Sequence, residues 1–228
     1  AKGTKTYRYY FAAWKVGGYR GLPPMNIACS GIPARGTAGE WRGLARGGTR
    51  LADALERLYH LFKDADTLGS LIDPRRAAES DRLTGVSFDE VAPLLHQALS
   101  RYGGEDPAQL VFARTAEEVA TAAKLLAGRC TLVVTNPPFL GRRHQAPGLA
   151  VYAEVVHGDS RHDLATMVLD RALGLAKRGS TIAFVLPQSW MTLKAFLDFR
   201  RRILGDVTVR LLARLGAGSQ RGEMRRER

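Results

Sequence analysis

The sequence predicts an α/β fold in which a parallel β-sheet carries helices on both faces. Helical and strand-like segments alternate along the second half of the chain, which is the pattern of parallel sheets with crossover helices. The strand-like segments are continuously apolar rather than alternating, which is typical of strands buried on both faces. With 228 residues, of which 45% are hydrophobic, the chain is large enough for one core, so we expect one domain.

Helical periodicity and capping signals predict three helices in the first half. Apolar residues at helical spacing indicate a first helix that ends near Gly69. Its apolar stripe consists of Leu51, Leu55, Leu58 and Phe62. A second helix is expected over residues 88–104, with Pro93 in its first turns. Thr115 is expected to cap a third helix that runs through Leu126, with Glu118 completing a capping box.

The second half predicts three strands that alternate with two helices. CTLVVT, over residues 130–135, is the first apolar strand, and a loop separates it from the helix that follows. The expected helices cover residues 163–176 and 189–204. The other expected strands cover residues 181–187 and 207–215.

The net charge of +12 is concentrated at the two ends of the chain. Residues 1–50 hold nine Lys or Arg and a single acid, Glu40, whereas residues 199–228 hold nine Lys or Arg and three acids. This polarity favours a polyanionic partner, although a solvated basic face gives the same pattern. Residues 5–21 interleave cations with aromatic rings, which suits phosphate contacts and base stacking. An amphipathic helix whose aromatic rings pack inward is the alternative.

Other features of the sequence bound the location of the protein. No apolar run approaches the roughly 20 residues of a membrane span, and nothing resembles a signal peptide. Cys29 and Cys130 are far apart and in no metal-ligand spacing. We therefore expect reduced thiols in a cytoplasmic protein. The chain begins with Ala1 rather than Met, which suggests a fragment.

The strand over residues 130–135 runs directly into Asn136-Pro137-Pro138-Phe139. In parallel sheets, ligands bind beyond the carboxyl ends of the strands, where this tetrapeptide lies. The Asn136 side-chain oxygen and the Pro137 carbonyl can accept the two hydrogens of an aromatic amine, and proline fixes the direction of that carbonyl. Phe139 offers a flat apolar face for a purine. Such an arrangement would position an exocyclic amine for attack on an electrophile.

The tetrapeptide is similar to the (Asp/Asn/Ser)-Pro-Pro-(Tyr/Phe/Trp) motif of S-adenosylmethionine-dependent amino-methyltransferases. Asn at its first position is usual in adenine-N6-specific DNA methyltransferases. Residues 163–201 resemble the next part of these enzymes, with a helix starting Asp-Leu, a Lys-Arg-Gly turn, and a strand ending in Pro before a Trp. This combination is typical of large restriction or phage-defence methyltransferases. The resemblance covers about residues 115–215.

The resemblance implies a Rossmann-like class I methyltransferase sheet, S-adenosylmethionine as cofactor, double-stranded DNA as substrate, and restriction or defence-system subunits as partners. Asn136 and the Pro137 carbonyl would bind the adenine amine, Phe139 would stack on the base, and the Pro138 backbone would lie close to the cofactor. The adenine must flip out of the duplex, because its amine cannot reach the cofactor while stacked.

One part of the family pattern is missing, namely the strand ending in a Gly-x-Gly turn that holds the cofactor. The glycine-bearing segments 15–21, 37–48 and 66–73 follow no credible strand. We therefore expect residues 1–228 to be a partial catalytic domain whose cofactor motif precedes Ala1. It would have a basic aromatic segment at residues 1–50 and an irregular basic tail at 216–228. Alone, the chain should bind DNA without methylating it.

Alternatives to this assignment are a non-catalytic remnant or nucleic-acid-binding module of the same fold, and an RNA or protein-glutamine N-methyltransferase. Arg142 and Arg143 follow the tetrapeptide closely and are candidates for DNA phosphate contacts or for plain solvent exposure. No metal is expected, because the polar residues of the following loop match no metal-ligand spacing. These residues are His144, His157, Asp159, His162 and Asp163.

Overall fold

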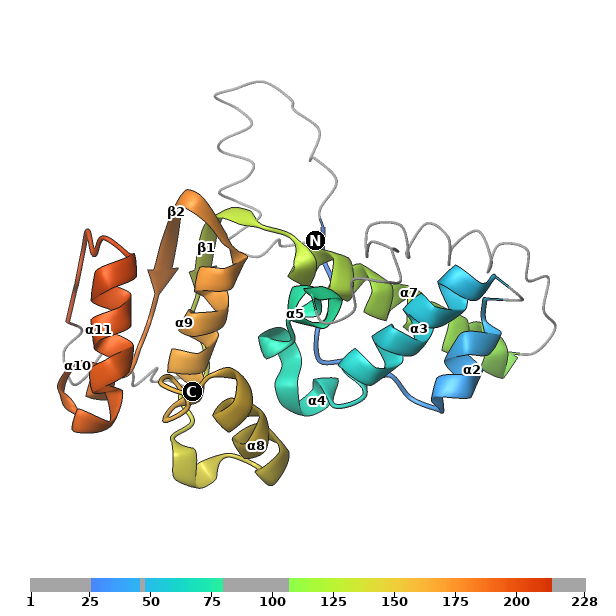
Figure 1. Ribbon diagram of the computed structural model, residues 1–228, viewed down its shortest axis with the longest axis horizontal. Helices are drawn as coiled ribbons and strands as arrows, with labels where there is room; N and C mark the ends of the chain where they lie inside the picture. The colour runs from blue at the N-terminus through green and yellow to red at the C-terminus, as the bar shows by residue number, and fades with distance from the viewer. Residues whose placement is uncertain (1–25, 46–47, 80–106, 215–228) are drawn as a thin grey trace, which may run out of the picture. The chain divides into compact units, whose positions relative to one another are not determined.

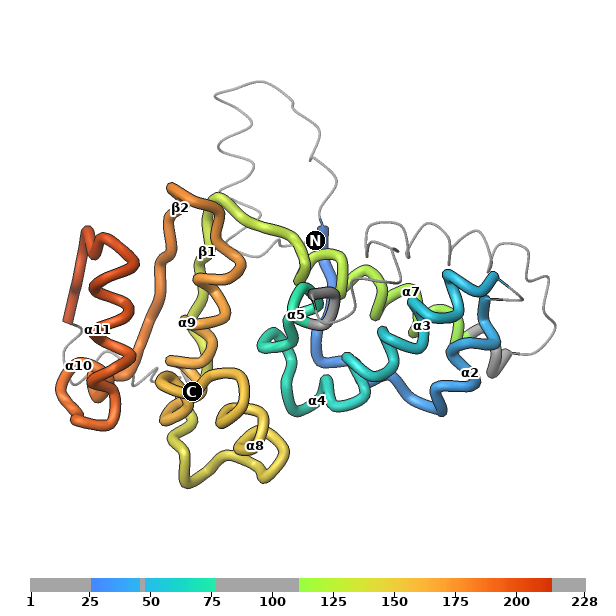
Figure 2. Tube along the Cα trace, viewed as in Figure 1, coloured from blue at the N-terminus to red at the C-terminus, as the bar shows by residue number. Residues whose placement is uncertain are grey.

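The computed structural model describes residues 26–45, 48–79 and 107–214 (Figure 1). The chain divides into two compact units, Ala1–Gly128 and Arg129–Arg228, which Figure 2 traces along the backbone. The described part of the first unit is helical, and that of the second is α/β. The predicted aromatic segment at residues 5–21, the expected helix at 88–104 and the tail at 216–228 lie outside the described residues.

Helices of different lengths build the first unit. The long ones are α3 (Thr49–Phe62) and α7 (Pro107–Ala127). The shorter elements are α2 (Ala38–Gly43), α4 (Ala65–Leu68), the 3-10 turn η1 (Gly69–Leu71) and α5 (Pro74–Glu79). Thr37 caps α2 in a reciprocal capping box with Glu40, which satisfies backbone donors at the start of the helix.

The core of the first unit confirms the predicted apolar stripe. All four of its residues are buried: Leu51, Leu55, Leu58 and Phe62. Trp41 of α2 is fully buried in the same cluster, and its indole Nε1 donates to the Arg35 carbonyl at 2.8 Å. The Phe112 ring of α7 meets Trp41 edge-on at 5.8 Å between ring centres. An indole packed in this way needs a partner for its N–H, and the Arg35 carbonyl supplies it.

The predicted cap at Thr115 is wrong. The helix begins at Pro107, so Thr115 lies inside α7, where its hydroxyl donates to the Val111 carbonyl at 3.0 Å. Proline suits the first turn of a helix because its missing N–H has no helical partner there. Threonine can bond the carbonyl four residues back, so a capping-box pattern need not mark a helix start.

Residues 129–214, the described part of the second unit, form two strands with helices between and after them. The strands are β1 (Cys130–Thr135) and β2 (Ala176–Phe184). Between them lie η2 (Arg142–His144), α8 (Pro147–Val156) and α9 (Leu164–Leu175). After β2 come α10 (Ser189–Thr192), η3 (Lys194–Phe196) and α11 (Leu197–Asp206).

The two strands are parallel neighbours, with Leu132 opposite Thr181 and Thr135 opposite Phe184. This pairing confirms the predicted first strand and the parallel α/β character of the fold. β2 starts at Ala176, whereas the strand was expected to start at residue 181. The Lys-Arg-Gly residues belong to the strand, and the pairing register with β1 is irregular there. Gly179 lies in that irregularity at φ +78°, a conformation that favours glycine.

Only one face of the two-stranded sheet is covered by the described residues. Ile182 and Phe184 of β2 pack against an apolar cluster formed by Leu169 of α9 and by Phe199 and Ile203 of α11. Figure 1 shows α9 running alongside the strands. The opposite face carries residues that remain exposed, with Leu132 at 58% and Val134 at 68%.

The region after β2 differs from the prediction in two ways. The helix expected over residues 189–204 is interrupted at Leu193, which separates α10 from η3. The expected last strand is wrong for its described residues, 207–214, which form no strand. An extended segment becomes a strand only beside a free strand edge, and Leu211 is 84% exposed rather than packed. Along the described ranges, no helix combines the length and apolarity needed to cross a membrane.

Candidate active site

Asn136-Pro137-Pro138-Phe139 follows β1 at the carboxyl edge of the sheet, as predicted. The end of the strand is tied to the neighbouring strand, because the Val185 N–H donates to the Thr135 carbonyl at 3.4 Å. Pairing stops there, since neither proline has an N–H to continue a ladder. The carbonyl groups of the tetrapeptide are thus released from the sheet at the edge where ligands bind in open α/β folds.

The four residues differ in their exposure. Pro137 is buried, whereas Asn136 and Pro138 are exposed, and Phe139 is 39% exposed. Within the described ranges, the Asn136 side chain has no hydrogen-bond partner. A free amide and an accessible aromatic ring in one tetrapeptide can bind a flat ligand that carries an amine, through an acceptor and a stacking face.

The chain after the tetrapeptide is held by backbone hydrogen bonds to the segment that precedes α9. The Leu164 N–H donates to the Leu140 carbonyl at 3.0 Å, and the Arg142 N–H donates to the His162 carbonyl at 3.0 Å. Gly141 and Asp163 form an isolated antiparallel bridge between these bonds. The tetrapeptide therefore lies between two fixed points. Thr135 is hydrogen-bonded to the neighbouring strand, and Leu140 is hydrogen-bonded to the first residue of α9.

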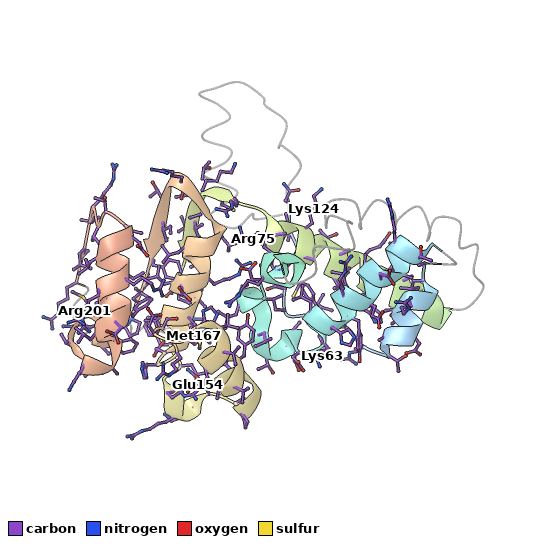
Figure 3. All side chains as sticks on the ribbon, in the orientation of Figure 1. Lys63, Arg75, Lys124, Glu154, Met167 and Arg201 are labelled. Carbon is purple, nitrogen blue, oxygen red and sulfur yellow. The ribbon has the colours of Figure 1, made fainter. Side chains whose placement is uncertain are left out.

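The start of α9 is itself rigidly built. The Asp163 carboxylate is buried and accepts from the Ala165 N–H at 2.8 Å, which caps the helix. The buried Thr166 hydroxyl contacts the Ser160 and Asp163 carbonyl oxygens at 2.6 and 2.7 Å. Met167, labelled in Figure 3, is fully buried one turn into α9. A capped and packed helix end gives the neighbouring loop a firm support.

Arg142 contacts three groups of the second unit. Its guanidinium donates to Gln145 Oε1 at 3.2 Å, to the Ala150 carbonyl at 2.9 Å and to Glu154 at 2.6 Å. Glu154 of α8, labelled in Figure 3, also pairs with Arg161 at 3.1 Å. One carboxylate thus joins an arginine of the loop after the tetrapeptide to an arginine of the segment before α9.

Arg143 differs from its neighbour in having an exposed side chain and no ion pair among the residues that the structure describes. Its guanidinium can therefore reach a phosphate without breaking an internal contact, whereas Arg142 would have to leave Glu154. Phosphate contacts from Arg142 and Arg143 both stay predictions, and the geometry favours Arg143 for this role.

Two of the remaining loop residues, Asp159 and His157, have ion-pair or hydrogen-bond partners. Arg202 of α11 binds Asp159 with two hydrogen bonds of 2.7 and 2.8 Å, and it reaches Asp170 at 2.8 Å. The buried His157 places Nδ1 at 2.7 Å from the other oxygen of Asp170. No group of three or more His, Cys, Asp or Glu residues able to hold a metal occurs in the described ranges.

The pKa values of three groups in this region, Asp170, Arg202 and His162, are shifted from their usual values. Burial alone would raise the pKa of Asp170, but the His157 hydrogen bond and the Arg202 charge together lower it below its usual value. The hydrogen bond to Asp159 is the main cause of the raised pKa of Arg202. Burial, assisted by the Arg161 charge, lowers the pKa of His162, which therefore favours its neutral form.

Sequence reasoning missed Gln145 and Glu154, which connect the loop after the tetrapeptide to its support. Neither residue lies in a motif, and the contacts that join them to Arg161 cross between two segments of the chain, so no local pattern indicated them. The structure agrees with the sequence about the glycine-bearing segments. The segment at 37–48 contains α2 (Ala38–Gly43), and the segment at 66–73 contains the end of α4 and η1, and no strand precedes either of them within the described residues.

Comparison with known proteins gives consistent similarities. Residues 109–220 match the Eco57I restriction-modification methylase family. The chain is 32% identical over 187 residues to the adenine-specific methyltransferase BrxX of Escherichia coli O9:H4 (strain HS), which covers 80% of this chain and 15% of that protein. It is 30% identical over 80 residues to the adenine-specific methyltransferase PglX of Lacticaseibacillus casei (strain Zhang), covering 35% of this chain and 7% of that protein.

These similarities confirm the resemblance to adenine-specific methyltransferases of restriction-modification type. The matched family segment includes the tetrapeptide, β1, α9 and β2. The chain spans only a small part of the length of either relative.

Proposed function

We propose that this chain, whose residues 109–220 match the methylase family, is the catalytic segment of a site-specific adenine-N6 DNA methyltransferase. The observation that carries the proposal is a tetrapeptide at the carboxyl edge of a parallel sheet whose Asn136 amide has no partner among the described residues and whose Phe139 ring is exposed. The substrate is double-stranded DNA in the cytoplasm, and restriction or defence-system subunits are the proposed partners.

In this proposal, the tetrapeptide binds an adenine that has flipped out of the duplex. Asn136 Oδ1 accepts one hydrogen of the N6 amine, and the Pro137 carbonyl accepts the other. Accepting both hydrogens favours a pyramidal nitrogen, whose lone pair is less delocalised into the ring. Phe139 stacks on the flipped base and holds its plane. Preorganised acceptors and a fixed base orient the amine for reaction without further movement of the protein.

S-adenosylmethionine, the proposed cofactor, supplies an electrophilic methyl group when bound. The described residues fit the amine-binding half of the site: the Asn136 amide and the Phe139 ring are exposed, and Pro137, which is buried, contributes its backbone carbonyl. They do not supply a strand followed by a Gly-x-Gly turn. Pro138, exposed beside the amine acceptors, is therefore the only residue that we assign to the cofactor side.

The finer fold assignment is also part of the proposal. A Rossmann-like sheet has helices on both faces and further strands beside β1 and β2. The exposed Leu132 and Val134 support this, because parallel strands are ordinarily buried on both faces. We propose that further elements of the complete methyltransferase domain cover this face.

The proposal is tested by following a labelled methyl group. The complete gene product is incubated with duplex DNA and S-adenosylmethionine labelled in the methyl group, and the DNA is digested to nucleosides. Label is expected in N6-methyladenine, and the Asn136→Ala variant is the matched control. Parallel reactions with RNA and with glutamine-containing peptides test the alternative substrates. Label in RNA, in peptide or in cytosine would contradict the proposal, and DNA binding without any transfer would favour a non-catalytic remnant.

A further inference from the structure

In the loop after the tetrapeptide, the Gln145 side chain contacts two segments: Leu140, next to the tetrapeptide, and Arg161, before α9. The Gln145 amide nitrogen donates to the Arg161 carbonyl at 3.1 Å and reaches the Leu140 carbonyl at 3.5 Å. Its amide oxygen accepts from Arg142 at 3.2 Å. Leu140 directly follows Phe139, whereas Arg161 precedes α9. Gln145 therefore connects the end of the tetrapeptide to the fixed end of a packed helix.

The side-chain contacts reinforce two backbone bonds that join the same segments. We use the term loop clamp for the hydrogen bonds that link residues 140–145 to residues 161–164, together with the Gln145–Leu140 bond within the first segment. The bond from the Leu164 N–H to the Leu140 carbonyl is the member nearest the tetrapeptide. Leu140 thus receives two donors, one from the backbone of α9 and one from the side chain of Gln145. Removing one leaves the carbonyl partly satisfied but less restrained.

The loop clamp matters for Phe139 in particular. Only four residues separate Thr135, fixed by the sheet, from Leu140, fixed by the clamp, and two of them are prolines with restricted φ. The direction of the Phe139 ring and of the Pro137 carbonyl therefore depends on both fixed points. Loosening the Leu140 end would change the orientation of these groups while leaving the sheet and the helices in place.

We propose that Gln145 is a positioning residue for the tetrapeptide: through the Leu140 and Arg161 carbonyls it holds Phe139 and Pro137 in the geometry that receives the base. This inference rests on the proposed methyl transfer to adenine. Gln145 acts through the backbone, and the donor half of its amide performs this role. Arg142 supports it by orienting that amide, because it binds Oε1 and leaves Nε2 directed at the two carbonyls.

Two substitutions of Gln145 distinguish the role of its amide N–H donor from the role of the whole side chain. Gln145→Ala removes every contact of the amide. Gln145→Glu keeps the size and an acceptor for Arg142 but places a carboxylate oxygen against two carbonyl oxygens, which removes the donor. Gln188→Ala is the matched control, because Gln188 is exposed and its side chain makes no capping hydrogen bond, although it is the N-cap residue of α10. Circular dichroism and thermal melting verify that each variant keeps its fold.

The first measurement is amide hydrogen exchange on the 228-residue chain, which needs no activity. In both Gln145 variants we expect exchange at the Arg142 and Leu164 amides to accelerate about tenfold or more, as local opening becomes easier. Exchange in α3 should stay at the wild-type rate, and Gln188→Ala should match wild type throughout. Unchanged exchange at Arg142 and Leu164 in both variants would overturn the inference.

The second measurement is methyl transfer by the complete gene product. We expect kcat to fall about 10- to 100-fold in both variants, in line with the cost of a small misplacement of reacting groups, while KM for DNA changes little. Wild-type kcat in Gln145→Glu would overturn the positioning role. If the wild-type protein transfers no methyl group but the exchange effect is present, the proposed function fails, while the hold of Gln145 on the loop is supported.

Discussion

The two units of the chain bury their apolar residues to different extents. In the first unit, the helical stripe of α3 and the Trp41 ring are enclosed in one cluster. In the second unit, one sheet face packs against α9 and α11, whereas Leu132 and Val134 on the other face stay exposed among the described residues. The helical unit thus buries its apolar stripe within its own core. The α/β unit has a sheet with one covered face, and it carries the candidate site.

This difference separates two kinds of residue. Buried residues of the helical unit should control stability, because their removal leaves cavities. Exposed residues at the carboxyl edge of the sheet should control binding and chemistry, because they have no internal packing to lose. Substitutions in each unit can therefore test whether stability and function are divided in this way.

The largest effect is expected from Leu58→Ala in the helical unit. Leu58 is fully buried, so its truncation should lower the free energy of unfolding by about 2–5 kcal/mol. Urea denaturation measures this change. Leu132→Ala is the matched control, and with an exposed side chain it should cost no more than about 0.5 kcal/mol. A cost near that of Leu58→Ala would show that the sheet face is covered in solution and would break the contrast between the units.

Asn136→Ala should affect catalysis and leave stability unchanged. Loss of one preorganised acceptor is expected to lower methyl transfer by the complete gene product about 10²–10³-fold, equivalent to about 2.7–4 kcal/mol. Single-turnover kinetics and cofactor titration measure the two aspects, and cofactor affinity should change little. Turnover close to that of wild type would remove Asn136 from its assigned role.

Phe139→Ala should weaken capture of the flipped adenine by about 1–3 kcal/mol, the range for loss of one stacking partner. Phe139→Tyr and Phe139→Trp should keep most of the activity, because the flat face of the ring binds the base. A fluorescent base analogue at the target position reports the capture. Equal signals from the wild-type and Ala forms would count against stacking by Phe139.

A smaller effect is expected from Arg143→Ala. Loss of one phosphate contact should weaken duplex binding similarly for all DNA sequences and reduce the salt slope of log K by about 1. Filter binding over a range of salt concentrations measures the slope for the 228-residue chain. Arg142→Ala is the informative comparison, because that arginine is paired with Glu154. A larger loss of slope for Arg142→Ala would reverse the assignment.

The smallest effect under ordinary conditions is expected at Asp170, because it emerges only in acid. The pKa of Asp170 is lowered in the fold, so its contribution to stability is present above the unfolded pKa of about 4 and is lost as the pH falls through the folded value. Asp170→Asn should therefore flatten the loss of unfolding free energy as the pH falls below the unfolded pKa of about 4. Asp206→Asn is the control, because Asp206 is exposed. If the unfolding free energy of both variants depends on pH with the same slope, the Arg202 and His157 contacts have no role in this effect.

Much of the second unit could be predicted from local sequence. The apolar run before Asn136 predicted β1 with its observed bounds, and apolar residues at helical spacing predicted the helix over residues 163–176, which is α9 with Asp163 as its N-cap. In the first unit, helical spacing predicted the buried face of α3. These signals are reliable because period, length and capping act within a few residues of chain.

Features that depend on distant partners could not be predicted. The early start of β2 requires the irregular pairing around Gly179, which no periodicity indicates. An apolar run at residues 207–214 has strand composition but no neighbouring edge among the described residues, so composition alone overstated it. Gln145 joins carbonyls on two segments, and neither its residue type nor its spacing announces that role.

The loop clamp has a consequence for the order of events during folding. The pairing of β1 with β2, and the bond between Leu140 and Leu164, both require segments separated by α8 to meet. Such closures lose chain entropy before their contacts form, so they tend to come later than single helices. We expect the tetrapeptide to acquire its fixed geometry only after α9 has docked on the strands. A nascent chain would therefore display the NPPF residues long before it could hold a base.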